Sequence, residues 1–319
     1  MILQILILLA GLVLIVGGAE FLVNGASSIA RKAGISEFII GLTIVGMGTS
    51  APEMVVSFVG AFSGNADIAV GNVLGSNIFN TLLILGISTM ICPMLITRSN
   101  KRVDIPANML FTLLLLALGL KYTLAGIGSD TLTRVDGGLL LLLFIAYMGW
   151  SFVKGKDSGT SDETPEKTYP LLLAIIMVLG GLAALVVGGN LFVDSATEIA
   201  KALGVSDKFI AVTILAGGTS LPELATCIVA AAKKKGQLAL GNIIGSNIFN
   251  ILLILGGSAL IHPLSFADID FLDAGILALS ALLLLLACYT GKRNTLDRFE
   301  GAIMFLCGIA YYTLLIAGL

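Results

Sequence analysis

The 319-residue sequence has few charged residues, only four cysteines and a single histidine. Charged residues make up 12% and hydrophobic residues 57%, a balance typical of an integral membrane protein and not of a water-soluble one. The cysteines show neither paired nor metal-ligand spacing, so no disulfide framework or cysteine-based metal site is expected. The histidine, His262, lies beside Pro263 at the end of an apolar run and supports no functional prediction. No nucleic-acid partner is expected.

The apolar runs are long enough to cross a bilayer, whose hydrocarbon core of about 30 Å requires roughly 20 helical residues. The first run begins at Ile2 without a basic segment before it, which indicates a retained span and not a signal peptide. The sequence therefore predicts an all-α membrane protein with ten transmembrane helices. Their approximate ranges are 2–25, 38–62, 68–91, 103–121, 135–153, 170–195, 208–232, 238–261, 271–290 and 298–318.

A duplication divides the chain into halves. An offset of 170 residues aligns the two halves without a gap, from Val16 on Val186 to Pro93 on Pro263. Each half holds five predicted spans, and an odd number reverses the second half relative to the membrane. We predict two inverted five-helix repeats, residues 1–153 and 170–319, with a hydrophilic linker over 154–169.

The distribution of basic residues predicts the orientation. Fourteen of the 18 lysines and arginines fall in loops that follow odd-numbered spans. Because lysine and arginine accumulate in short cytoplasmic loops, these loops are expected in the cytoplasm. The protein is thus predicted to lie in the cell membrane as a multi-pass protein, with the linker in the cytoplasm and both termini outside.

Each half carries one glutamate inside a predicted span, Glu53 and Glu223. An ionised carboxylate is costly inside a bilayer, so such residues face a cavity or a partner and indicate a functional site. A structural ion pair is disfavoured because no basic residue lies in the interior of their spans; Lys208 is the first residue of the second one. Pro52 and Pro222 lack an amide hydrogen and interrupt their helices, which frees backbone carbonyls that can bind cations.

Hydroxyl and amide side chains surround these glutamates in the sequence. Thr49 and Ser50 share a helical face with Glu53, and the second half repeats the pattern with Thr219 and Ser220 before Glu223. Polar residues also recur every four positions, Asn72, Ser76 and Asn80 in one span and Asn242, Ser246 and Asn250 in its counterpart. These stripes fit hydrogen bonding between helices, cation binding, or both.

The predicted donors are hard oxygen atoms. Ca²⁺ takes 6–8 such oxygens at about 2.3–2.6 Å, and Na⁺ also suits them. No histidine lies near the site in the sequence and only Cys227 is a turn away, so soft transition metals fit poorly.

At these residues the chain resembles the cation/calcium antiporter superfamily, specifically the sodium/calcium exchanger branch and its bacterial members. The resemblance covers nearly the whole chain and rests on two motifs that each occur twice, Gly-Thr-Ser-x-Pro-Glu and Gly-Ser-Asn-x-x-Asn. It implies a central Ca²⁺ site formed by Glu53, Glu223, the carbonyls of Thr49 and Thr219, and Asn80 and Asn250. It also implies Na⁺ sites on the two sides, one formed by Ser50, Ser246 and the Gly46 carbonyl, and the other by Ser220, Ser76 and the Ala216 carbonyl.

One position departs from the family pattern. Many relatives carry an aspartate where this chain has Asn250, and the potassium-dependent branch uses that aspartate. The asparagine leaves two carboxylates in the site, which argues against K⁺ co-transport.

The resulting functional prediction is a secondary antiporter that exchanges cytoplasmic Ca²⁺ for external Na⁺ by alternating access. It is not expected to be an enzyme, to need a cofactor or to require a protein partner; its partners are the two ions and the lipid bilayer. The main alternative is a proton-coupled cation exchanger, since two neighbouring carboxylates in a low dielectric can carry protons. A cation channel would use similar oxygen rings. An intramembrane acid-catalysed enzyme is disfavoured because paired aspartates are missing.

Overall fold

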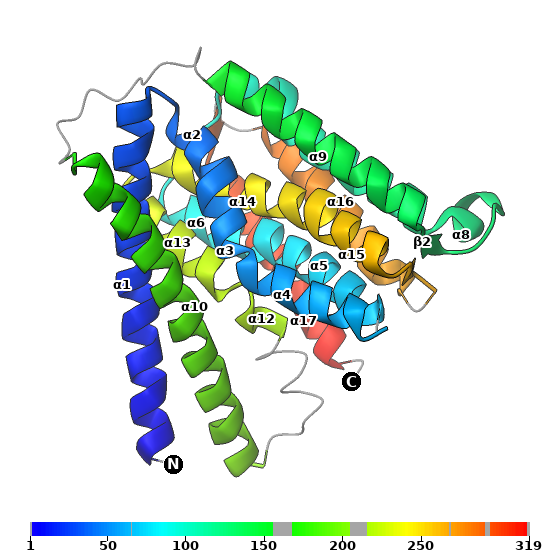
Figure 1. Ribbon diagram of the computed structural model, residues 1–319, viewed down its shortest axis with the longest axis horizontal. Coiled ribbons are helices and arrows are strands. Elements are labelled where there is room, and N and C mark those ends of the chain that lie inside the picture. The colour runs from blue at the N-terminus through cyan, green and yellow to red at the C-terminus, as the bar shows by residue number, and fades with distance from the viewer. Residues whose placement is uncertain are drawn as a thin grey trace.

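Helices dominate the computed structural model, which describes residues 2–64, 66–155, 168–204, 216–267, 269–290 and 294–317 (Figure 1). The first half contains α1 (Ile2–Ala33), α2 (Glu37–Ile40), η1 (Gly41–Val45), α3 (Gly46–Thr49), α4 (Ala51–Phe62), α5 (Ala66–Ile78), η2 (Phe79–Ile84), α6 (Leu85–Ile91), β1 (Met94–Leu95), η3 (Asn100–Asp104), α7 (Ile105–Gly119), α8 (Lys121–Ala125), β2 (Thr131–Leu132) and α9 (Arg134–Gly155). The second half contains α10 (Leu171–Ala202), α12 (Ala216–Gly218), α13 (Leu221–Ala232), α14 (Gly236–Phe249), η5 (Asn250–Leu255), α15 (Gly256–Ile261), β3 (Leu264–Ser265), α16 (Phe271–Ala287), β4 (Thr295–Leu296) and α17 (Arg298–Ala317). The η segments are π-helical turns.

Within the described residues, seven helices are long and apolar enough to span a membrane, and one bent pair brings the number to eight. These match eight predicted spans, although α1 and α10 run several residues further than predicted, to Ala33 and Ala202. The spans predicted over 208–232 and 271–290 correspond to two shorter apolar helices, α13 and α16. Residues 205–215 and most of the predicted linker lie outside the described part of the chain. The helical membrane architecture is confirmed, and the number ten stays a prediction.

The second span is broken beside Pro52. The axis bends by 48° between residues Glu37–Thr49 and Ala51–Phe62. Proline cannot donate a backbone hydrogen bond and its ring clashes with the preceding turn, so it is tolerated in the first turn of a new helix and not in the interior. Pro52 accordingly lies in the first turn of α4, and Pro222 occupies the equivalent place in α13. The break falls at Ser50, two residues before Pro52.

The two longest helices, α1 and α10, pack side by side and run in opposite directions (Figure 1). Glycines bring their backbones into contact: a Cβ atom at Gly18 would lie 2.8 Å from the carbonyl oxygen of Gly181. Small residues allow this close approach between membrane helices. Many of the large apolar side chains on their outer sides are exposed, as expected for contact with lipid.

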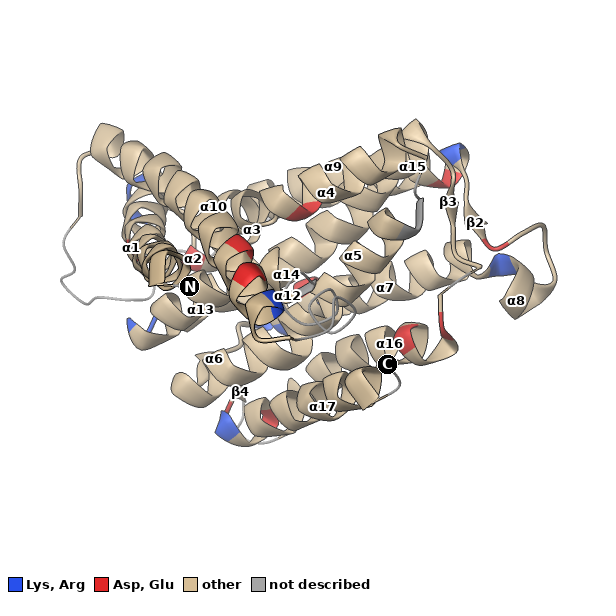
Figure 2. Cartoon of the chain, turned by 90° about the horizontal axis from the view of Figure 1, so that it is seen from below, with Lys and Arg blue, Asp and Glu red and all other residues tan. Residues whose placement is uncertain are grey.

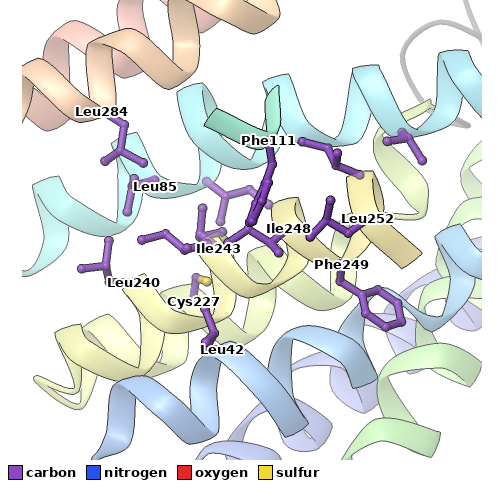
Figure 3. Packing of buried hydrophobic residues seen from close by; sticks show 14 of the residues in the cluster. Leu42, Leu85, Phe111, Cys227, Leu240, Ile243, Ile248, Phe249, Leu252 and Leu284 are labelled. Carbon is purple, nitrogen blue, oxygen red and sulfur yellow. The ribbon is translucent and has the colours of Figure 1, made fainter. Parts of the chain in front are cut away.

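The span Gly236–Ile261, formed by α14, η5 and α15, passes through the centre of the protein. In its most apolar 18-residue window 94% of residues are buried, against 22% for α1. Figure 3 shows Ile243, Ile248 and Leu252 of this span among the buried apolar side chains of neighbouring helices. The equivalent span of the first half, Ile68–Ile91, has 67% of its window buried. The duplicated asparagine motifs therefore lie on deeply buried spans.

Two short antiparallel sheets connect the halves. β1 pairs with β4, with Met94 opposite Leu296, and β2 pairs with β3, with Thr131 opposite Ser265. The 170-residue offset makes β1 and β3 equivalent in sequence, yet they belong to different sheets. Figure 2 shows β4 well separated from β2 and β3, and charged residues mostly near helix ends and connections. Equivalent connections of the two halves thus lie in different places.

Candidate cation-binding site

The two glutamates of the duplicated motif lie together in the interior. Glu53, in the first turn of α4, and Glu223, in the first turn of α13, are both fully buried, each 0% exposed. Ser50 Oγ donates a hydrogen bond to Glu223 Oε1 at 2.8 Å, and Ser220 Oγ donates to Glu53 Oε1 at 3.2 Å. Each carboxylate is therefore held by the serine of the other half. The two copies of the motif form one site.

Each glutamate also has a carboxylate oxygen without a partner. Glu53 Oε2 and Glu223 Oε2 are buried and accept no hydrogen bond within the described residues. Three salt bridges among the described residues involve other acids, Glu20, Glu37 and Asp136. A buried carboxylate needs a compensating positive charge or donors, and two of them carry the charge that one divalent cation balances.

Asn80 and Asn250 add two further oxygens. Both are fully buried, and they lie in the equivalent π-helical turns η2 and η5. The amide nitrogen of Asn80 donates to Asn247 Oδ1 at 3.3 Å, and that of Asn250 donates to Asn77 Oδ1 at 3.0 Å. The carbonyl oxygens of both side chains have no partner within the described residues. Single π-turns inside membrane helices occur frequently at functional sites, which fits this placement.

The structure brings one predicted Na⁺-ligand group together. Ser246 Oγ lies 3.2 Å from the Gly46 carbonyl oxygen and 3.4 Å from Glu223 Oε1, the same oxygen that Ser50 contacts. Thr49 Oγ1 is 3.4 Å from this Gly46 oxygen and 3.1 Å from Asn242 Oδ1. These contacts join the first half of the chain directly to α14.

The second predicted group is described less completely. Ser220 contacts Glu53, and Ser76 Oγ is buried without a partner among the described residues. Thr219 Oγ1 is likewise buried without a hydrogen-bond partner among the described residues. Ala216 begins α12, directly after the segment that the structure does not describe, so its carbonyl is not placed against Ser76 or Ser220.

The donors that converge on the site are oxygens. Among the described residues, no group of three or more histidine, cysteine, aspartate and glutamate side chains is arranged to hold a metal. Cys227, one turn after Glu223, is engaged elsewhere: its sulfur accepts from Asn242 Nδ2 at 3.2 Å and lies 3.7 Å from the Ala239 carbonyl oxygen. Two carboxylates with amide and hydroxyl oxygens suit hard cations such as Ca²⁺ and Na⁺.

Asn77 and Asn247 were assigned no role from the sequence, although they lie inside the duplicated Gly-Ser-Asn motif. Both are buried and contact the asparagines of the site. The sequence feature that could have identified these two residues is the repetition of the motif in both halves. The partner of each side chain lies in the other half of the chain, and sequence spacing carries no information about such a contact.

Comparison with known proteins agrees with the family resemblance seen in the sequence. The family described as sodium/calcium exchanger protein matches residues 3–153 and 173–317. The putative antiporter CaxA of Alkalimonas amylolytica is 40% identical over 99% of both chains, and the sodium/calcium exchanger MaX1 of Methanosarcina acetivorans is 34% identical over 97% of both. A solved structure of the sodium-calcium exchanger NCX_Mj superposes with a TM-score of 0.84 at 33% identity, covering 100% of this chain and 99% of the other.

Proposed function

The chain belongs to the sodium/calcium exchanger protein family and is a Na⁺/Ca²⁺ antiporter of the membrane, and we propose that Ca²⁺ binds between Glu53 and Glu223. The observation that carries this assignment is four buried oxygens that have no hydrogen-bond partner among the described residues: one carboxylate oxygen from each glutamate and one amide oxygen each from Asn80 and Asn250. The backbone carbonyls of Thr49 and Thr219, beside the two helix breaks, complete the set. No resident cofactor is needed for this function.

Na⁺ occupies positions that share ligands with Ca²⁺. On one side the ligands are Ser50, Ser246 and the Gly46 carbonyl. Ser50 and Ser246 both donate hydrogen bonds to Glu223, and Ser246 also contacts the Gly46 carbonyl oxygen, so these groups already lie together. On the other side they are Ser220, Ser76 and the Ala216 carbonyl. Because Ser50 and Ser220 contact the glutamates, Na⁺ at either position competes with Ca²⁺ for the same negative charge. This competition makes the site hold one kind of ion at a time, which coupled exchange requires.

Alternating access follows from an inverted duplication. We assign ten spans in two five-helix repeats, residues 1–153 and 170–319, joined by a linker over 154–169; α13 and α16 contribute to the seventh and ninth spans. Two observations support the inversion: α1 and its counterpart α10 run antiparallel, and the equivalent strands β1 and β3 belong to different sheets. The family match leaves a gap over the proposed linker. Two inverted halves around a fixed site can open it to either side in turn.

The linker is assigned to the cytoplasm and both termini to the outside. Basic side chains support this orientation, because they are concentrated on the face that is predicted to be cytoplasmic. On this face, where α13 ends beside the first span, Lys233 binds Glu20 at 2.9 Å and Lys235 binds Glu37 at 3.0 Å. Lys101, close to the β1–β4 sheet, belongs to the same predicted face. In the sequence, the opposite predicted face, with the β2–β3 sheet, carries four of the 18 lysines and arginines: Lys121, Arg134, Lys201 and Lys208.

Cysteine labelling tests the orientation. In a background with Cys92 and Cys307 replaced by alanine, Lys234→Cys is expected to react with a membrane-impermeant maleimide only from the cytoplasmic side, and Ser129→Cys only from outside. Both positions are exposed and follow an odd-numbered and an even-numbered span, respectively. Labelling after permeabilisation serves as the control for reactivity. Reaction of both cysteines from the same side would contradict the inverted arrangement.

Ion dependence tests the coupling. Purified protein in liposomes loaded with Na⁺ is expected to take up ⁴⁵Ca²⁺ from Na⁺-free medium, and to do so equally when K⁺ is removed from both sides. The physical reason is that Asn250 supplies a neutral oxygen, so the site lacks a third carboxylate to hold an additional monovalent ion. Uptake driven by a pH gradient in Na⁺-free vesicles would instead support proton coupling. Collapse of the Na⁺-driven flux without K⁺ would contradict K⁺ independence, and a steady Ca²⁺ conductance without counter-ion would indicate a channel.

A further inference from the structure

Two asparagines outside the proposed ligand set hold the ligand asparagines across the interface between the halves. Asn77 and Asn247 are each 2% exposed. Asn77 Oδ1 accepts the amide hydrogen of Asn250 at 3.0 Å, and Asn247 Oδ1 accepts that of Asn80 at 3.3 Å. The two bonds are related by the 170-residue offset, since Asn77 matches Asn247 and Asn80 matches Asn250. We call these four side chains the asparagine clasp.

The direction of these bonds decides which end of each ligand amide faces the site. An asparagine side chain has one acceptor oxygen and one donor NH₂ group at nearly equal distances from the backbone. Only the oxygen can bind a cation, because the NH₂ group presents hydrogen atoms with partial positive charge. The clasp engages the NH₂ groups of Asn80 and Asn250, and both of their oxygens remain buried without a partner among the described residues.

The clasp residues are themselves anchored, in a different way in each half. Asn247 Nδ2 donates to Thr81 Oγ1 at 2.8 Å. The residue equivalent to Thr81 is Ile251, which has no hydroxyl, and Asn77 Nδ2 donates instead to the backbone carbonyl of Asn247 at 3.2 Å. Each clasp residue therefore presents its oxygen to the ligand asparagine because its own NH₂ group already has an acceptor.

We propose that Asn77 and Asn247 are positioning residues of the cation site, which fix the amide oxygens of Asn250 and Asn80 toward the bound Ca²⁺. The proposal rests on the proposed function, because it requires these two oxygens to be ligands. Hydrogen bonds that merely join helices would not require both amide oxygens to stay unpartnered in the interior, where an unsatisfied acceptor is unfavourable. Partners that orient metal ligands commonly change metal affinity by about 10- to 100-fold when they are removed.

The first test measures equilibrium ⁴⁵Ca²⁺ binding to purified protein in detergent. Asn77→Leu removes the acceptor for Asn250 and is expected to weaken Ca²⁺ binding about tenfold. Asn108→Leu is the matched control, since Asn108 is an equally buried asparagine in α7, outside the clasp. Thermal unfolding of both variants separates general destabilisation from the loss of affinity.

The second test asks through which residue Asn77 acts. In an Asn250→Ala background, Asn77→Leu is expected to have no further effect on Ca²⁺ affinity, because the oxygen that it positions is gone. In an Asn80→Ala background, Asn77→Leu should still weaken binding about tenfold, since Asn80 is held by Asn247. Both backgrounds retain Glu53 and Glu223 and lose one neutral oxygen each, so their Ca²⁺ binding stays measurable.

The outcomes distinguish the clasp from the site itself. If Asn250→Ala weakens binding but Asn77→Leu does not, the positioning role is wrong and the proposed Ca²⁺ site stands. An equal effect of Asn77→Leu in both backgrounds would also overturn the positioning role. Unchanged affinity in both Asn80→Ala and Asn250→Ala would remove these residues from the ligand set and the proposal with them.

Discussion

Replacement of either central glutamate by glutamine is expected to abolish Na⁺-dependent Ca²⁺ transport and to leave the protein folded. Glutamine has the same size and still accepts the hydrogen bond that Ser220 or Ser50 donates, so local packing is retained. The substitution removes one of the two negative charges of the proposed Ca²⁺ site. Loss of one partner from a buried charge pair costs about 2–5 kcal/mol, which weakens binding roughly 30- to several thousand-fold.

The measurement is ⁴⁵Ca²⁺ uptake by Na⁺-loaded liposomes that contain Glu53→Gln or Glu223→Gln protein, with equilibrium binding in detergent as a second readout. Glu300→Gln is the matched control: Glu300 is 5% exposed and its carboxylate accepts a hydrogen bond from the Asp297 backbone at 3.1 Å, in α17 and outside the site. The control should transport like the wild type. Wild-type flux in Glu53→Gln or Glu223→Gln would refute the assignment of that glutamate.

The residue types of the site could be predicted from the sequence, because both motifs are duplicated and intramembrane glutamates are rare. Their pairing could not. Sequence spacing places Ser50 on the face of Glu53, but the helix ends at Ser50, and its hydroxyl binds Glu223 from the other half. Local periodicity holds only within one helix, and at a break the direction of a side chain is set by tertiary contacts.

The spans likewise separate what local hydropathy predicts from what depends on tertiary packing. Hydropathy predicts eight spans close to their observed positions because long apolar segments must form helices in a bilayer. It does not predict that α1 and α10 continue to Ala33 and Ala202, since their last turns are polar and basic. Nor does it separate the buried span Gly236–Ile261 from the exposed α1, because both are apolar and only packing distinguishes protein from lipid as the neighbour.

The asparagine clasp was missed for a related reason. Asn77 and Asn80 are three residues apart, a spacing typical of one helical face, whereas their hydrogen bonds run to the second half of the chain. The duplication indicates that the two motifs meet near the bilayer centre, but it does not indicate which side chain meets which. The difference between Thr81 and Ile251 is visible in the sequence and acquires meaning only from the contact of Thr81 with Asn247.

Gly245→Ala is expected to destabilise the protein strongly and to abolish exchange. A Cβ atom at Gly245 of α14 would clash with the carbonyl oxygen of Leu42 in η1 and would lie 2.7 Å from its carbonyl carbon. These are backbone atoms of a buried helical turn, so no side-chain rotation relieves the clash and the two helices must separate. Overpacking of a well-packed interior costs typically about 1–3 kcal/mol, and occasionally more.

The functional loss follows from the next residue in the chain. Ser246 Oγ contacts the Gly46 carbonyl oxygen at 3.2 Å, and Thr49 Oγ1 contacts Asn242 Oδ1 at 3.1 Å, so α14 and the broken second span form one wall of the site. Separation of these elements by even an ångström lengthens both contacts beyond hydrogen-bonding distance. The proposed Na⁺ position at Gly46, Ser50 and Ser246 would be lost first.

The control is Gly189→Ala in α10, where no heavy atom of the described residues outside the local helix backbone lies within 4 Å of the added Cβ. Alanine is favoured over glycine in a helix interior by about 1 kcal/mol, so this variant should be as stable as the wild type or slightly more stable. Thermal unfolding in detergent and Na⁺-driven ⁴⁵Ca²⁺ uptake are measured on both variants. Gly245→Ala protein that unfolds at the wild-type temperature and transports normally would mean that α14 and η1 do not approach this closely. A folded Gly245→Ala protein with weakened Na⁺ and Ca²⁺ binding would instead show that the helix contact sets the geometry of the site.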